Sequence, residues 1–267
     1  LELNTLPSSA VIIGAGAVAL EFASLWNAAG CEVTLLIRKD RVLSTWERRA
    51  SMTLTRELKR RGVNVIARTA VDRVDTGANL GATVHYRQGD SDEDRTAYGE
   101  VVLAAIGRVP NTDADWFRSS GLKLDERGYV TVDGYGRTNL DGVWALGDIT
   151  PGHALAHRAF EQGITIAEKI DGADPKPVID DTVPQVVFSF PEAASVGLTL
   201  DQAKAREDVV EPKETAYPML SNARMLMSGE GGSMTVVSGA FANNPDMQVV
   251  LGVHIVSPIA SDLIAEA

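Results

Sequence analysis

Residues 10–19, AVIIGAGAVA, join a short apolar run to a glycine-rich turn and the start of a helical pattern. The apolar run predicts a buried strand, which Gly14 and Gly16 interrupt. Gly14 permits a tight turn, Gly16 lets a phosphate approach the backbone, and Ala19 lets the helix pack closely on the strand. Free N–H groups at the helix N-terminus then attract phosphate. The pattern predicts a dinucleotide site, with a purely structural glycine turn as the alternative.

Strands and helices alternate beyond this turn. The apolar periodicity predicts helices over 17–29 and 48–61 and strands over 32–37, 63–67 and 101–106. This alternation is typical of a parallel sheet with right-handed crossovers. Short alternating stretches predict an antiparallel β-meander over 71–99, with an exposed polar tip. The first part of the chain is therefore predicted to be an α/β domain.

The second half of the chain has a more mixed pattern. We expect strands over 129–132, 142–146, 183–190, 195–197, 234–238 and 248–255, and helices over 154–170, 200–206 and 259–267. The polar segment 171–181 contains two prolines and is predicted to be a linker. The apolar, methionine-rich stretch 219–227 fits either a dimer surface or plain core.

Composition excludes several classes of function. The 267 residues carry a net charge of −11, which argues against a nucleic-acid partner and against docking on an anionic membrane. No apolar run reaches the length of a membrane span, and no Cys-rich metal site is expected because Cys31 is the only cysteine. Cys31 is predicted to be a buried core thiol, and the protein to be cytoplasmic. Since the chain starts at Leu1 without methionine, we expect an internal piece of a longer protein.

The end of the second strand bears on the choice of nucleotide. A carboxylate at this position commonly binds the adenosine ribose 2′-OH of NAD. Here Ile37 is followed by Arg38-Lys39-Asp40-Arg41, so three cations cluster where a 2′-phosphate would lie. The pattern favours NADP modestly over NAD, and a solvated basic turn is the alternative.

A second candidate ligand position is Gly147-Asp148, at the end of the apolar stretch GVWALGD (142–148). A carboxylate at the carboxyl end of a parallel strand can accept hydrogen bonds from ribityl or ribose hydroxyls. For this motif alone, a helix N-cap or a turn aspartate is an equal alternative.

Six stretches together resemble the flavoprotein disulfide reductase family. They are GAGAVALEFA (14–23), AAIGRVPNT (104–112), GVWALGD (142–148), LAHRAFEQG (155–163), VFSFPEAASVGLT (187–199) and GVHIVSPIASDLIAEA (252–267). Their order and spacing match from end to end, so the resemblance covers nearly all of the chain. Residues 155–157 and 191–199 are most similar to the dihydrolipoamide dehydrogenase branch. Residues 35–43, LLIRKDRVL, are instead similar to the NADPH-dependent glutathione reductase branch.

The resemblance implies an α/β chain of three parts. Residues 1–113 would form a Rossmann-type NAD(P) domain, 114–182 the C-terminal part of an FAD domain, and 183–267 a truncated α+β interface domain that makes a homodimer. The family's Cys-x4-Cys redox pair and its catalytic His–Glu pair have no match in this chain. We therefore expect a fragment that binds nucleotide without turnover.

The resemblance also assigns cofactor-binding residues. Glu21 matches a supporting glutamate near the flavin–nicotinamide junction, and Arg108 is expected to tune charge beside the flavin; structural salt bridging is the alternative for both. The other matched positions are Gly14, Gly16, Ala19, Val71 and Gly107 for NAD(P), and Gly147, Asp148, Leu155, Ala156 and His157 for FAD.

The predicted activity of the parent protein is oxidation of a dihydrolipoyl dithiol, with electrons passing through FAD to NAD(P). The implied partners are a small-molecule or lipoyl-domain dithiol or disulfide and a second copy of the chain. Two alternatives stay open. One is an NADPH-dependent reductase of another disulfide, mercuric ion or quinone, and the other is a non-catalytic NAD(P)-binding module.

Overall fold

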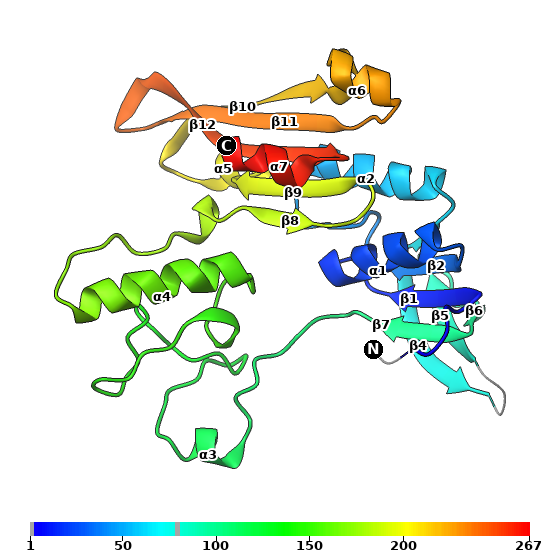
Figure 1. Cartoon of the computed structure of the whole chain (residues 1–267), viewed down its shortest axis with the longest axis horizontal. Helices are drawn as coiled ribbons and strands as arrows, with labels where there is room; N and C mark the ends of the chain where they lie inside the picture. Colours follow the sequence, from blue (N-terminus) through cyan, green and yellow to red (C-terminus); the bar gives the residue numbers. More distant parts are fainter. Residues whose placement is uncertain (1–2, 78–80) are drawn as a thin grey trace. The chain divides into compact units, whose positions relative to one another are not determined.

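The chain folds as two compact units in the computed structural model, which describes residues 3–77 and 81–267 (Figure 1). Unit 1 comprises Leu1–Gly107 and Pro184–Ala267, and unit 2 comprises Arg108–Val183. Unit 1 contains a parallel sheet, an antiparallel meander and a second antiparallel sheet. The predicted α/β class is therefore confirmed.

The parallel sheet has the strand order β3-β2-β1-β7. Its elements are β1 (Ser9–Ile13), α1 (Ala17–Ala28), β2 (Glu32–Ile37), α2 (Arg48–Arg60), β3 (Asn64–Ala67) and β7 (Val101–Ala104). Ile12, Leu35 and Leu54 are fully buried in one cluster, because the apolar run of each strand faces the apolar stripe of a helix. All predicted elements of this sheet are confirmed, with boundaries that differ by one or two residues.

The meander consists of β4 (Thr69–Thr76), β5 (Ala82–Gln88) and β6 (Arg95–Gly99), paired antiparallel in that order. Val84 and Tyr86 are buried on the face that packs against Val11 and Leu36 of the parallel sheet. The predicted meander and its exposed tip are confirmed.

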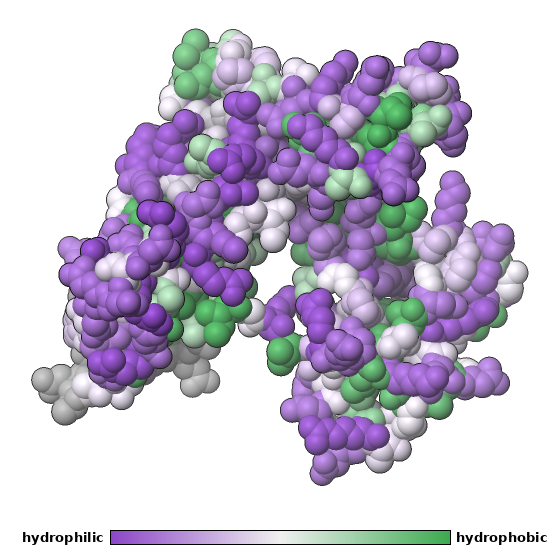
Figure 2. Space-filling view, turned by 180° about the vertical axis from the view of Figure 1, so that it is seen from behind, coloured by the Kyte–Doolittle hydropathy of each residue, from purple (hydrophilic) through white to green (hydrophobic). Residues whose placement is uncertain are grey.

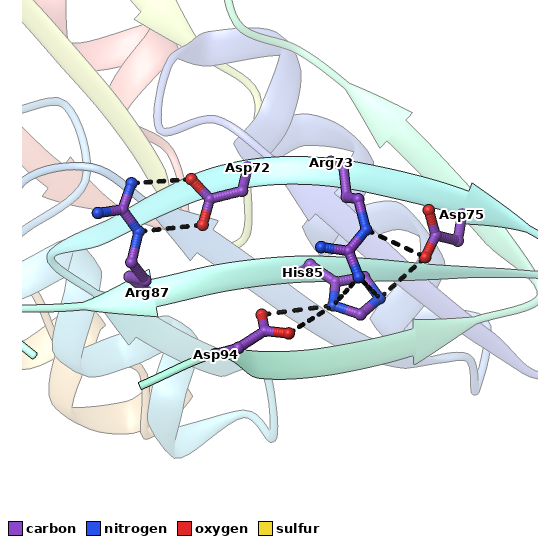
Figure 3. A network of polar contacts seen from close by, with 6 residues as sticks. All are labelled: Asp72, Arg73, Asp75, His85, Arg87 and Asp94. Carbon is purple, nitrogen blue, oxygen red and sulfur yellow. Dashed lines mark hydrogen bonds and ion pairs between the residues drawn. The ribbon is translucent and has the colours of Figure 1, made fainter. Parts of the chain in front are cut away.

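A polar network crosses the other face of the meander (Figure 3). The two ring nitrogens of His85 lie 3.0 Å from Asp94 and 3.1 Å from Asp75. The guanidinium of Arg87 donates two hydrogen bonds to Asp72, at 2.8 and 3.1 Å. These contacts link β4 to β5 and hold Asp94, the last residue of the acidic loop before β6, against β5.

The second antiparallel sheet of unit 1 has the order β10-β11-β12-β9-β8. It comprises β8 (Gln185–Val187), β9 (Glu192–Gly197), β10 (Val209–Pro218), β11 (Ser233–Phe241) and β12 (Asn244–Ser257), with α5 (Leu200–Ala205), α6 (Ala223–Ser228) and α7 (Ala260–Leu263). The predicted strand over 183–190 is shorter than expected. The helix expected over 259–267 divides into α7 and a 3-10 turn, Ile264–Glu266.

The methionine-rich stretch is split between core and surface. Met219 and Met225 are buried, whereas Leu226 and Met227 of α6 are 65% and 89% exposed. The hydrophobic residues that gather at α6 are visible at the upper left of Figure 2. Among the described helices, none has the length and apolarity needed to cross a membrane.

A buried histidine lies in the middle of this second sheet. His254 on β12 is fully buried; its Nδ1 is 2.7 Å from the Ser195 hydroxyl, and its Nε2 is 3.1 Å from the Leu198 carbonyl. Because a carbonyl can only accept, Nε2 carries the proton and the Ser195 hydroxyl donates to Nδ1. Both ring nitrogens are thus satisfied by the neutral form, and burial lowers the pKa of His254.

This lowered pKa predicts a stability loss in acid. Below the ordinary histidine pKa of about 6.5, the His254 side chain is protonated in the unfolded chain but stays neutral in the folded chain. The free energy of unfolding should therefore fall by up to about 1.4 kcal/mol per pH unit more in the wild type than in His254→Gln. Urea unfolding between pH 7.5 and pH 5 measures this difference. Parallel pH profiles of the two proteins would contradict the assignment.

Unit 2 contains less regular structure than predicted. Its elements are α3 (Asp115–Arg118), α4 (Ala156–Ile170) and two 3-10 turns, Gly147–Ile149 and Asp180–Thr182. The strands expected over 129–132 and 142–146 are wrong, because Val130 and Trp144 make only isolated bridges, to Leu124 and Arg137. Backbone groups there form turns instead of a ladder; the Ala145 N–H, for example, donates to the Gly136 carbonyl at 2.9 Å.

Candidate functional site

The first candidate site is the turn between β1 and α1. Gly14 has φ +141°, and its N–H donates to the Leu36 carbonyl at 3.0 Å. A Cβ at this position would lie 2.3 Å from the Ala105 carbonyl oxygen, so the close approach of the chain after β7 requires glycine. The turn thus lies at the carboxyl edge of the parallel sheet, where ligands bind in open α/β folds.

Gly16 is exposed and is the N-cap of α1. Among residues 3–77 and 81–267, no atom lies within 4 Å of a Cβ built on it, and no side chain caps the helix. The first turn of α1 contains no acidic residue, while Ala19 is fully buried against the sheet. The backbone N–H groups of this terminus are therefore available to an anion, and the positive end of the helix dipole is not neutralised.

The basic turn after β2 lies beside this glycine turn, because β1 and β2 are paired. Arg38 and Lys39 are exposed, and neither side chain has an ion-pair partner among the described residues. Arg41 differs, since its guanidinium contacts Asp40 at 3.0 Å and donates to the Ser44 carbonyl at 3.1 Å. Of the three predicted cations, two are open to solvent and the third is held within its own loop.

Three further predicted residues of unit 1 have distinct surroundings. Val71 is half-buried and packs in the core of the meander. Gly107 has φ +146°, with open space where its Cβ would lie. Glu21 on α1 accepts a hydrogen bond from the Phe188 N–H at 3.0 Å.

Sequence reasoning missed this contact of Glu21 and its neighbour. The Phe190 N–H donates to the Ser24 hydroxyl at 3.1 Å, so α1 holds the segment after β8 through two backbone donors. Backbone donors have no side-chain signature, and the partners are separated by more than 160 residues. No local pattern could have found them.

The predicted FAD-binding residues gather within unit 2. The Arg108 guanidinium lies 3.5 Å from the Asp148 carboxylate and 3.4 Å from the Ala154 carbonyl oxygen. Gly147 has φ +71°, and its N–H donates to the Gln162 side chain at 2.9 Å. The structure therefore brings Arg108 and the Gly147-Asp148 turn next to the residues that precede α4.

The start of α4 resembles the start of α1. Leu155 is its N-cap, without a side-chain hydrogen bond, and its first turn contains no acidic residue. Ala156 and His157 are exposed in this first turn. The Asp148 side chain is 55% exposed, so its carboxylate can still accept a hydroxyl donor.

Cys31 is buried, as predicted, and has no disulfide partner. Burial raises the pKa of its thiol, with smaller contributions from Glu100 and Glu32, so the reactive thiolate is disfavoured.

Two family models match the chain. The pyridine nucleotide-disulphide oxidoreductase model matches residues 1–163. The model of the dimerisation domain of the same family matches residues 183–267.

Relatives and solved structures agree with these models. The dihydrolipoyl dehydrogenases of Cupriavidus necator and Geobacillus stearothermophilus are each 36% identical, over 100% of this chain and 54% of their own length. The structure of LpdA (Rv3303c) from Mycobacterium tuberculosis has a TM-score of 0.84 at 30% identity, covering 99% of this chain and 55% of that one. The flavoprotein disulfide reductase RclA from Escherichia coli also has a TM-score of 0.84, at 25% identity. The chain thus spans about half the length of the curated relatives it matches.

Proposed function

The chain belongs to the pyridine nucleotide-disulphide oxidoreductase family, and we propose that it is the nucleotide-binding and dimerisation part of a dihydrolipoyl dehydrogenase. The observation that carries this proposal is the open, uncapped turn at Gly16, at the carboxyl edge of the parallel sheet. The names of the relatives support the choice of dithiol. Residues 1–113, 114–182 and 183–267 would be the NAD(P), FAD and interface parts.

The residues of the glycine turn fit a dinucleotide. Open space over Gly16 leaves room for a pyrophosphate against the backbone, and the uncapped N–H groups of α1 supply donors. Arg38 and Lys39 would hold a 2′-phosphate, which favours NADP over NAD. Val71 and Gly107 would line the nicotinamide end.

The residues of unit 2 fit part of an FAD site. The exposed Asp148 carboxylate would accept hydrogen bonds from ribityl hydroxyls, oriented by Arg108 at 3.5 Å. Gly147 would allow close approach, and Leu155, Ala156 and His157 at the start of α4 would contact the flavin. When bound, FAD supplies the electron transfer between nicotinamide and dithiol.

Glu21, Cys31 and the interface part have separate proposed roles. Glu21, anchored by the Phe188 N–H, would position the nicotinamide end beside the flavin. Cys31 is buried and is the only cysteine of the sequence, so it would take no part in exchange with a dithiol. Residues 183–267 would form the homodimer through their antiparallel sheet, and a lipoyl-domain or free dithiol would be the substrate of the longer protein.

The test is a titration of the 267-residue chain with NADPH and NADH, followed by fluorescence, together with an absorbance scan for flavin. We expect saturable nucleotide binding and no lipoamide-dependent turnover by this chain. The longer protein should oxidise dihydrolipoamide with NAD(P). Failure to bind either nucleotide would overturn the site at Gly16. If the longer protein binds nucleotide but does not oxidise dihydrolipoamide, only the proposed substrate is wrong, and the nucleotide site stands.

One observation favours a second candidate. Arg38 and Lys39 are exposed and have no ion-pair partner in the part of the chain that the structure describes, which suits an NADPH-dependent reductase of another disulfide, mercuric ion or quinone. Assay of the longer protein with NADPH and each acceptor separates the two functions.

A further inference from the structure

Positive charge is concentrated in one segment of an acidic protein. Residues 38–61 hold nine of the 25 Lys and Arg residues but only three of the 36 Asp and Glu residues. The segment has a formal charge of +6 in a chain of −11, which leaves −17 for the remainder. Such polarisation exceeds what solubility requires and can steer a partner of opposite charge.

The cations form a stripe along the solvent side of α2. Arg48, Met52, Arg56 and Arg60 are four residues apart and are all exposed, so they follow one face of the helix. At 1.5 Å per residue, this face is about 18 Å long. The opposite face, with Leu54 and Leu58, is buried.

Two carboxylates of the segment, Glu47 and Glu57, lie beneath the stripe. Glu47 is 2% exposed and accepts hydrogen bonds from the N–H groups of Arg49 and Ala50, at 2.7 and 2.8 Å. The Glu57 side chain is 11% exposed and is paired with Arg60 at 2.8 Å. Arg48 has no ion-pair partner among the described residues. Two carboxylates from outside the segment, Glu214 and Glu230, pair with Arg49 and Arg61 at 3.1 and 2.6 Å and offset part of its charge. Arg48 thus remains open to a partner.

A cavity of about 420 Å³ opens at the N-terminal end of this stripe. Arg48 and Arg56 line it, with Met52 between them, 53% exposed. Glu214 of β10 lies on the far wall and is paired with Arg49 at 3.1 Å. Glu47 also lines the cavity, but its carboxylate already accepts the N–H groups of Arg49 and Ala50. The cavity thus offers cations, one apolar contact at Met52 and the carboxylate of Glu214.

We propose that the stripe on α2 and its cavity bind an acidic polypeptide segment. Its carboxylates would meet Arg48 and Arg56, an apolar side chain would cover Met52, and a backbone N–H would donate to Glu214. A polynucleotide or an anionic membrane fits less well, because each would place dense negative charge against Glu214 and leave Met52 without an apolar partner. The proposal stands apart from nucleotide binding at Gly16.

The test uses a fluorescein-labelled peptide of four Asp-Glu-Leu repeats with the 267-residue chain. Fluorescence anisotropy at low salt should show saturable binding that weakens steeply as NaCl is raised. The double variant Arg48→Glu/Arg56→Glu should weaken binding by about tenfold or more, because two opposite charges become like charges. The matched variant Arg118→Glu/Lys176→Glu makes the same change of net charge at exposed positions of unit 2 and should weaken it by less than about twofold.

Three results would overturn the proposal. Equal losses in the two double variants would mean that only net charge matters. Tighter binding of the single-stranded oligonucleotide dT12 would point to nucleic acid. Displacement of the peptide by saturating NADPH would place it on the nucleotide turn. Circular dichroism of each variant establishes that the fold is retained. Met52→Ala should weaken peptide binding without altering its salt dependence, because Met52 makes an uncharged contact.

Discussion

Gly16→Val is expected to lower the affinity for NADPH and NADH by about a hundredfold, because several charge-assisted hydrogen bonds to the pyrophosphate are blocked together. The side chain would occupy the open space beside the uncapped N-terminus of α1. A Cβ at this position meets no protein atom within 4 Å, and Gly16 has φ −89°, which valine tolerates. The free energy of unfolding should therefore change by no more than about 1 kcal/mol, the size of an N-cap effect.

Gly14→Ala provides the contrast. Its Cβ would lie 2.3 Å from the Ala105 carbonyl oxygen, and φ +141° is strained for any L-residue with a side chain. We expect about 2–3 kcal/mol of destabilisation from strain and overpacking. Gly30→Ala, with φ +91° and nothing within 4 Å, measures the backbone cost alone.

Calorimetric titration and urea unfolding separate these effects. A Gly16→Val protein that binds nucleotide normally would show that the pyrophosphate lies elsewhere. A Gly16→Val protein that unfolds as easily as Gly14→Ala would show that the turn is only structural.

The local part of the fold could be predicted because its signals are local. The apolar run before Gly14 and the helical periodicity after Gly16 each lie within a few residues of what they determine. Burial of Cys31 followed from its place at the start of an apolar strand.

The errors fall where distant pairing decides the structure. Residues 129–132 and 142–146 have strand-like composition, but a strand needs a ladder partner, and the described residues give each only an isolated bridge. The opposite error concerns β10, a strand that the sequence pattern did not predict. It contains Pro212, Pro218 and three charged residues. Proline is tolerated there because β10 is an edge strand with a bulge between Val210 and Lys213.

In the candidate site, too, local features could be predicted from the sequence and long-range contacts could not. The glycine positions of the turn are visible in the sequence because backbone geometry demands them. The Arg41–Asp40 pair and the hydrogen bond from Phe188 to Glu21 depend on loop conformation and on a distant backbone donor. They could be identified only from the structure.

The choice of nucleotide gives the second large effect. Arg38→Ala/Lys39→Ala is expected to lower NADPH affinity by about tenfold to a hundredfold, the value of one or two charge-assisted contacts to a 2′-phosphate. Both side chains are exposed, so their loss should leave the fold intact. NADH has no 2′-phosphate, and its affinity should change by less than about twofold.

Arg41→Ala is the matched control for this basic turn. Its guanidinium is 17% exposed and is committed to Asp40 and the Ser44 carbonyl, so NADPH affinity should change little. An equal loss in Arg41→Ala would mean that this side chain leaves its loop to bind the phosphate. If the double variant loses NADPH and NADH affinity together, the turn acts on the shared pyrophosphate. If it loses neither, the two cations are a solvated surface and NAD becomes the preferred nucleotide.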